Sequence, residues 1–106
     1  MESVIHTARI SIDLDSRTVE VKDRPLRLTP KEYAILELLC LRKGTTVSRE
    51  TLLHHLYRGD DEPDPGIINV FVCNLRKKLM NATAGDNYIE TVWGQGYLLR
   101  DPPPRD

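Results

Sequence analysis

Apolar and polar residues alternate in the first quarter of the chain, which predicts short β-strands. Ile10, Ile12 and Leu14 are separated by single polar residues. A period of two places every second side chain on the buried face of a strand. A turn-forming segment that contains proline follows at 22–25. We therefore expect residues 4–28 to form a small antiparallel sheet.

The apolar spacing then changes to about 3.6 residues, which predicts helices. Thr29 can cap a helix, Pro30 suits its first position, and Glu32 completes a capping box. A strongly apolar helix should follow and stop near Gly44. A second helix, with leucines that face the core, should begin at the Ser48 cap.

The second half of the chain predicts one longer helix and a hairpin. Two prolines and a glycine exclude a helix interior at 60–66, and a third helix is expected over about 66–80. Two strands are expected at 88–92 and 97–99, joined by a glycine-flanked turn at 93–96. This order of elements is typical of a helix-turn-helix that is followed by a wing.

The third helix has two different faces on a helical wheel. The apolar face, which should contact the core, consists of Ile68, Phe71, Val72, Leu75 and Leu79. The residues on or near the opposite face are Gly66, Asn69, Val70, Cys73, Asn74 and Lys77. Arg76 and Lys78 lie on the two flanks. The exposed face lacks the glutamate–lysine pairs of an ordinary solvated helix.

Such a face fits the major groove of DNA, which admits one helix. Asparagine can bond an adenine edge, and Val70 or Ile67 can contact a thymine methyl group. Arg76, Lys77 and Lys78 can bind phosphates, which hold a protein on DNA without reading its sequence. The alternative is a surface helix whose charges are merely solvated, because a basic cluster alone is a weak motif.

Composition and charge narrow the class of protein. The 106 residues suit one domain, and the 40% hydrophobic and 29% charged residues exclude a wholly disordered chain and a membrane protein. No stretch of the sequence suits a signal peptide, so the expected location is the cytoplasm. The net charge is −1, but it is sorted along the chain: residues 60–66 carry −4 and residues 67–80 carry +3.

The sequence offers no set of residues for catalysis or metal binding. Two cysteines are too few for a disulfide scaffold, and Cys73 has no histidine at helical spacing that would activate it. The adjacent His54 and His55 would point about 100° apart on a helix, so they cannot chelate one ion. We therefore predict a protein that is not an enzyme and has no cofactor and no metal site.

Four segments, in order, carry a resemblance to a known family: LTPKEYAILELL, VSRETLLHHLY, VFVCNLRKKL and YIETVWGQGYLLR. They resemble the winged-helix effector domains of OmpR/PhoB-type two-component response regulators, and in particular the CtrA-type cell-cycle regulators. The resemblance implies an α+β fold, with an N-terminal antiparallel four-stranded sheet, three helices and a C-terminal β-hairpin wing. We assign residues 1–101 to this DNA-binding domain and 102–106 to a flexible tail. The receiver domain of such regulators is absent from this chain.

The resemblance also implies roles for single positions, with the third helix in the major groove and the hairpin near the minor groove. Family base-reading positions match Val70 and Asn74, with Ile67 and Asn69 nearby, and the wheel adds Cys73 as a small residue on the same face. Family phosphate contacts match Tyr57, Arg76, Thr91 and Tyr97, and the basic Lys77 and Lys78 join them. The wing turn consists of Trp93, Gly94, Gln95 and Gly96.

Some of these positions have a second interpretation. Tyr57 and Trp93 could be half-buried aromatic residues that only contribute to packing. Gly66, Asn74 and Gln95 stand where relatives often carry a basic residue, so affinity should be modest or depend on dimerisation.

The acidic segment between the second and third helices also has two interpretations. It is either a solvated connector or, as the resemblance implies, a surface that meets RNA polymerase and points away from DNA. Its acidic residues are Asp60, Asp61, Glu62 and Asp64.

The leading hypothesis is sequence-specific binding of double-stranded promoter DNA. The expected target is a pair of AT-rich tandem half-sites, and the isolated domain should be a monomer that pairs on DNA. No membrane partner is expected. The alternative is a winged-helix protein-interaction module without DNA binding of its own, which the near-neutral net charge favours.

Overall fold

The computed structural model describes residues 3–59 and 61–103, and it begins with an antiparallel sheet of four strands in the order β1-β2-β3-β4. The strands are β1 (Val4–Thr7), β2 (Ile10–Asp13), β3 (Thr18–Val21) and β4 (Arg24–Leu26). The predicted meander is thus confirmed, although its last turn is shorter than expected. Only Lys22 and Asp23 form that turn, with φ values of 53° and 65°. Pro25 lies in edge strand β4, where a residue without an N–H group is tolerated.

Three helices follow the sheet, at α1 (Pro30–Leu41), α2 (Arg49–Tyr57) and α3 (Ile67–Ala82). The predicted capping box is present: the Thr29 N–H donates to Glu32 Oε1 at 2.9 Å, and the Glu32 N–H donates to Thr29 Oγ1 at 3.2 Å. Ser48 caps α2, because its Oγ accepts from the Thr51 N–H at 3.1 Å. Both helix starts were therefore encoded locally in the sequence.

The third helix begins one residue later and ends two residues later than the predicted 66–80. Gly66 is its N-cap and provides no side-chain oxygen. The carboxylate of Asp64 instead accepts from the Gly66 N–H at 2.7 Å and orders the turn before the helix. At the other end Thr83 is the C-cap, and its hydroxyl and its N–H both donate to the Leu79 carbonyl, at 2.7 and 3.0 Å.

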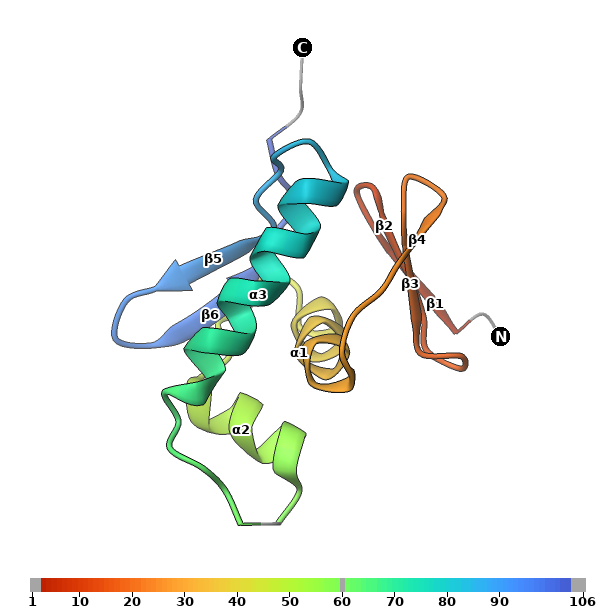
Figure 1. Ribbon diagram of the computed structural model, residues 1–106. Coiled ribbons are helices and arrows are strands. Elements are labelled where there is room, and N and C mark those ends of the chain that lie inside the picture. Colours follow the sequence, from red (N-terminus) through yellow and green to blue (C-terminus); the bar gives the residue numbers. More distant parts are fainter. Residues whose placement is uncertain (1–2, 60, 104–106) are drawn as a thin grey trace.

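The chain ends in the predicted hairpin, which consists of β5 (Ile89–Val92) and β6 (Gly96–Leu99). Val47 pairs with Tyr97 and attaches β6 to the loop between α1 and α2. Figure 1 shows the hairpin projecting from one side of α3, away from the four-stranded sheet. These elements confirm the α+β winged-helix fold. Of the expected tail, 102–103 are described and 104–106 lie outside the described residues.

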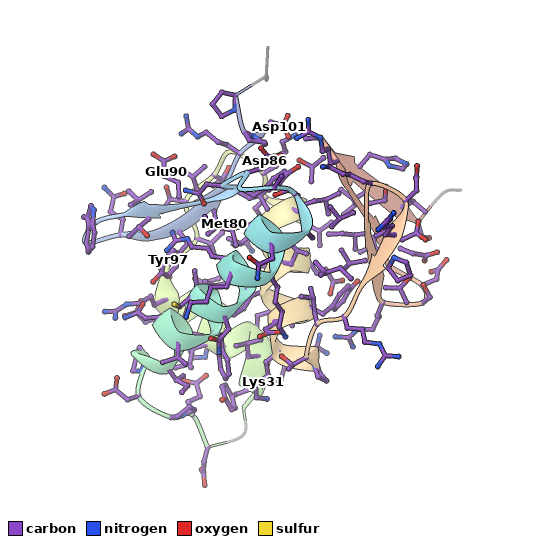
Figure 2. The ribbon with its side chains drawn as sticks, turned by 45° about the horizontal axis from the view of Figure 1, so that its top comes forward. Lys31, Met80, Asp86, Glu90, Tyr97 and Asp101 are labelled. Carbon is purple, nitrogen blue, oxygen red and sulfur yellow. The ribbon has the colours of Figure 1, made fainter. Side chains whose placement is uncertain are left out.

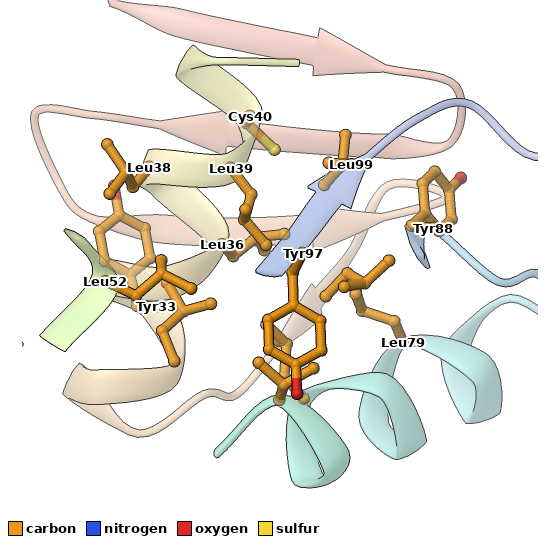
Figure 3. Close-up of a cluster of buried hydrophobic side chains, with 14 of the residues drawn as sticks. Tyr33, Leu36, Leu38, Leu39, Cys40, Leu52, Leu79, Tyr88, Tyr97 and Leu99 are labelled. Atoms are coloured by element: carbon orange, nitrogen blue, oxygen red, sulfur yellow. The ribbon is translucent and has the colours of Figure 1, made fainter. Parts of the chain in front are cut away.

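Helix α1 forms the centre of the molecule and contacts the sheet, both other helices and the hairpin. Its leucines pack with side chains from α2, α3 and β6 in one continuous core (Figure 3). Cys40 lies in this core, and burial raises the pKa of its thiol to about 12, so it stays protonated. Within the described parts of the chain, no helix is long and apolar enough to cross a bilayer.

Candidate nucleic-acid interface

The two faces of α3 are those that the helical wheel predicts. Ile68, Val72, Leu75 and Leu79 are buried, whereas Phe71 is only half-buried. The opposite face is open to solvent and carries Asn69, Val70, Cys73, Asn74 and Lys77. Val70 is 52% exposed, although it is apolar. No residue between 67 and 82 is acidic, so nothing on α3 itself repels a polyanion.

A hollow lies beside this face, between α3 and the wing. Asn69 and Arg76 line it from the helix, Thr91 and Gln95 line it from the wing, and Arg49 and Glu50 line it from the start of α2. Residue Arg49 was missed by the sequence analysis, although its place directly after the Ser48 cap puts it at an exposed helix N-terminus. The hollow and the face of α3 together form one continuous surface.

Arg76 ties the wing to α3 at this surface. Its Nε donates to the Ile89 carbonyl at 3.0 Å, and its Nη2 donates to Thr91 Oγ1 at 2.7 Å. Its guanidinium carbon lies 5.5 Å from the centroid of the Tyr97 ring. The hydroxyl of Thr91 thus has a structural partner, and Arg76 holds its positive charge between helix and wing.

Tyr97 has a structural role that its predicted phosphate contact did not anticipate. Its ring is buried between the hairpin and α3 (Figure 2), with 7% of the residue exposed. Its hydroxyl donates to Asn69 Oδ1 at 2.5 Å. The two residues lie 28 positions apart in the sequence, and no local pattern indicates the contact.

Lys78 also differs from its predicted phosphate role. Its Nζ lies 2.6 Å from Oε1 of Glu32, whose side chain is only 4% exposed. Burial raises the pKa of Glu32, but the hydrogen bonds from Lys78 and the Thr29 N–H and the charge of Lys78 outweigh it. The pKa is therefore held below its ordinary value of 4.5. Lys78 points its charge at α1, so we assign it to the stability of the fold.

Tyr57 and Trp93, the two aromatic residues that could serve only for packing, differ in their burial. Tyr57 is half-buried at the end of α2, and Lys31 Nζ lies 4.5 Å from the centroid of its ring. Trp93 is 87% exposed at the wing turn, so the packing interpretation of Trp93 is wrong. The neighbouring Gly94 and Gln95 are also exposed, whereas Gly96 is partly covered.

The acidic segment is exposed and partly anchored. Asp61, Glu62 and Asp64 are exposed. Glu62 Oε2 lies 2.5 Å from His54 Nδ1 of α2, which fixes one point of the segment beside that helix. Asp60 lies outside the described residues.

The described residues contain no group of three or more histidine, cysteine, aspartate or glutamate side chains that could hold a metal ion. Cys73 is exposed on the open face of α3, and Cys40 is buried. The chemistry on this surface is that of amides, hydroxyls, a few positive charges and the carboxylate of Glu50. Groups of this kind bind a partner through hydrogen bonds and charge.

Comparisons with known proteins match this geometry. A family described as "Transcriptional regulatory protein, C terminal" matches residues 23–99. The chain is 57% identical over 101 residues to the cell cycle transcriptional regulator CtrA of Caulobacter vibrioides. This match covers 95% of this chain and 44% of that protein. The chain is 55% identical over 101 residues to the cell cycle response regulator CtrA of Brucella anthropi, with the same coverage of 95% and 44%. The chain thus spans less than half the length of these relatives.

A solved structure is also similar. The RstA DNA-binding domain of Klebsiella pneumoniae, in complex with the RstA box, superposes with a TM-score of 0.80 at 28% identity. The match covers 93% of this chain and 98% of that domain. The similarity therefore extends over the sheet, the helices and the hairpin together.

Proposed function

The chain belongs to the family of C-terminal domains of transcriptional regulators, the OmpR/PhoB-type effector domains of response regulators, and from this premise we propose that it binds double-stranded promoter DNA. Helix α3 enters the major groove, and the wing approaches the minor groove. The observation that carries the proposal is the open face of α3, which is small, polar and free of acidic residues along a helix of 16 residues. The RstA domain, a relative of the same fold, is described in complex with DNA.

We assign the roles on this surface by side-chain chemistry. Base edges are read by the amides and small apolar groups of α3, because these match the donors, acceptors and methyl groups of the major groove. The residues are Ile67, Asn69, Val70, Cys73 and Asn74. Phosphates are held by charge and hydroxyl groups at the edges of the surface. These residues are Tyr57, Arg76, Lys77 and Thr91, and the hollow adds Arg49.

A titration at two salt concentrations tests the function. The protein is added to a labelled duplex with AT-rich tandem sites and to a scrambled duplex of the same composition. We expect tighter binding of the first duplex and weaker binding of both at higher salt, because phosphate contacts release counterions. Equal and weak binding of both duplexes would favour the protein-interaction module.

Two substitutions on α3 should separate base reading from phosphate binding. Both Asn74 and Lys77 are exposed, so neither change should cost more than about 0.5 kcal/mol of stability. Asn74→Ala should cost about 1–3 kcal/mol on the preferred duplex and leave the scrambled duplex unaffected. Lys77→Ala should weaken both duplexes alike and reduce the salt slope by about one unit.

The same titrations show how α3 sits in the groove. If Lys77→Ala changes the sequence preference and Asn74→Ala changes nothing, then α3 is rotated relative to the proposed position. If both variants bind like the parent, α3 does not contact DNA.

We further propose that the acidic segment faces RNA polymerase in the whole regulator. The double variant Asp61→Ala with Glu62→Ala should bind DNA as well as the parent or slightly better, since it removes anions near a polyanion. Transcription activation by a regulator that carries the same changes should fall. A tenfold loss of DNA binding would instead place the segment against the duplex.

The proposed assembly is a monomer in solution that pairs on DNA within the bacterial cytoplasm. Two copies would occupy tandem half-sites about one helical turn apart, or 10–10.5 base pairs. Sedimentation at low protein concentration should therefore give a monomer without DNA and two copies per tandem duplex. A stable dimer in the absence of DNA would contradict this assembly.

A further inference from the structure

Tyr97 joins the wing to the open face of α3 through its hydroxyl group. The hydroxyl donates to Asn69 Oδ1 at 2.5 Å, and Figure 3 shows the ring extending from β6 toward α3. Tyr97 is 7% exposed, whereas Asn69 is exposed in the first turn of α3. A buried group thus fixes an amide on the DNA-facing surface.

The hydroxyl of Tyr97 cannot easily move away from this position. The backbone of Tyr97 exchanges two hydrogen bonds with Val47, at 2.7 and 3.0 Å. The guanidinium of Arg76 covers the ring, and Thr91 and the Ile89 carbonyl hold that guanidinium in turn. The ring therefore holds the hydroxyl at a fixed place, and the flexible asparagine side chain orients against it.

The orientation matters because the two ends of an amide have similar shapes but opposite hydrogen-bonding properties. The oxygen accepts and the NH₂ group donates. In the structure the phenolic proton is donated to the oxygen, which leaves Nδ2 of Asn69 to donate outward. Because a hydroxyl has one proton, Tyr97 cannot donate to Asn69 and to a phosphate at the same time.

We propose that Tyr97 is a positioning residue for sequence recognition, which fixes the Asn69 amide so that its Nδ2 donates to a base at one position of the half-site. The acceptors that the major groove presents to such a donor are guanine O6 and N7, adenine N7 and thymine O4. This inference rests on the proposed DNA-binding function. It goes further by assigning the hydroxyl of a buried wing residue to base preference.

The test uses Tyr97→Phe, which keeps the ring, the stacking of Arg76 and the pairing with Val47, and removes only the hydroxyl. The parent first selects preferred duplexes from a library with a randomised central segment. The variant should bind the selected duplex roughly tenfold more weakly than the parent does, by analogy with a lost base contact. It should bind a scrambled duplex as well as the parent does. A second selection with the variant should lose the preference at one base-pair position.

A double-variant comparison shows whether the effect passes through Asn69. Asn69→Ala should lose the preference at the same base pair. Tyr97→Phe should then have no further effect in the Asn69→Ala protein, because coupled residues are not additive. The matched control is Tyr88→Phe: Tyr88 is also buried, and its hydroxyl accepts from the Arg9 N–H at 3.1 Å, away from α3 and the wing turn. It should leave the preference unchanged.

Three results would overturn the inference. An equal loss on both duplexes, with a lower salt slope, would mean that the hydroxyl binds a phosphate. A loss that persists in the Asn69→Ala protein would mean that Tyr97 acts through another group. A lower melting temperature with unchanged preference would mean that the bond is only structural.

The failure of this inference can be told apart from the failure of the proposed function. If the parent selects no preferred sequence, the proposed function fails and the inference fails with it. If the parent selects a site and Tyr97→Phe binds it as the parent does, only the inference falls.

Discussion

Replacing Gly96 with alanine should reduce the free energy of unfolding by about 3–5 kcal/mol, at the upper end for single substitutions. Gly96 has a φ of +149°, and a Cβ built on it would lie 2.1 Å from the carbonyl oxygen of Val47. The obstacle is backbone, and the pairing of Val47 with Tyr97 holds it in place. Strain at such a φ costs about 1–3 kcal/mol, and the clash adds to it by separating β6 from Val47.

Gly94→Ala is the matched control for this change. Gly94 lies in the same turn at a φ of +77°, but a Cβ there would meet nothing within 4 Å. Gly94→Ala should reduce the free energy of unfolding by only about 1–2 kcal/mol, which is the cost of a left-handed conformation for alanine. Urea unfolding of both variants measures the difference. An equal cost for the two would show that the approach of Gly96 to Val47 is not tight in solution.

Gly96→Ala should also lose the preference for the selected DNA sequence. Tyr97 follows Gly96 directly, so a displaced β6 withdraws its hydroxyl from Asn69. Titration of the two duplexes measures this loss, and Gly94→Ala should keep more of the preference than Gly96→Ala.

Local signals in the sequence predicted most of the fold. The capping box at Thr29, the Ser48 cap and the apolar stripe of α3 each depend on residues within a few positions of one another. Such signals work because capping and helical periodicity are properties of one or two turns. The start of α3 was predicted less accurately, because Gly66 gives no side-chain cap and Asp64 bonds within the preceding turn.

The candidate site was predicted less completely, and the three basic residues of α3 show why. Successive residues of a helix point about 100° apart, so Arg76, Lys77 and Lys78 cannot all three lie on one surface. Arg76 binds the wing, Lys77 faces solvent, and Lys78 binds Glu32. The charge cluster was visible in the sequence, but its partners were not. Glu32 and Lys78 are 46 positions apart, and only the fold brings them together.

Lys78→Met should reduce the free energy of unfolding by about 2–3 kcal/mol at pH 7. Removing one partner of a buried ion pair costs about 3–5 kcal/mol, because the other charge remains buried. We expect less here, since the Lys78 side chain is 38% exposed and solvent screens part of the pair. Glu32 still accepts from the Thr29 N–H, so the cap itself should survive.

The pH dependence of the free energy of unfolding shows whether the charge of Glu32 causes the loss of stability in Lys78→Met. In the parent, the folded pKa of Glu32 lies below 4.5. The stabilisation is therefore fully present above pH 4.5 and is lost as the pH falls through the folded pKa. In Lys78→Met, burial remains and the hydrogen bond and charge of Lys78 are gone, so the pKa of Glu32 should rise above its value in the parent. The variant should thus recover stability relative to the parent as the pH falls from 7 to 4, which urea unfolding at each pH measures.

Two further variants make this result specific to the buried carboxylate. Lys77→Met removes the same charge one residue away, at an exposed position, and should change stability by less than about 0.5 kcal/mol. Glu32→Gln keeps an oxygen for the Thr29 cap and removes the charge, so Lys78→Met should cost little in that protein. If Lys78→Met costs the same with glutamate or glutamine at position 32, packing of the lysine stem and not its charge stabilises α3 on α1.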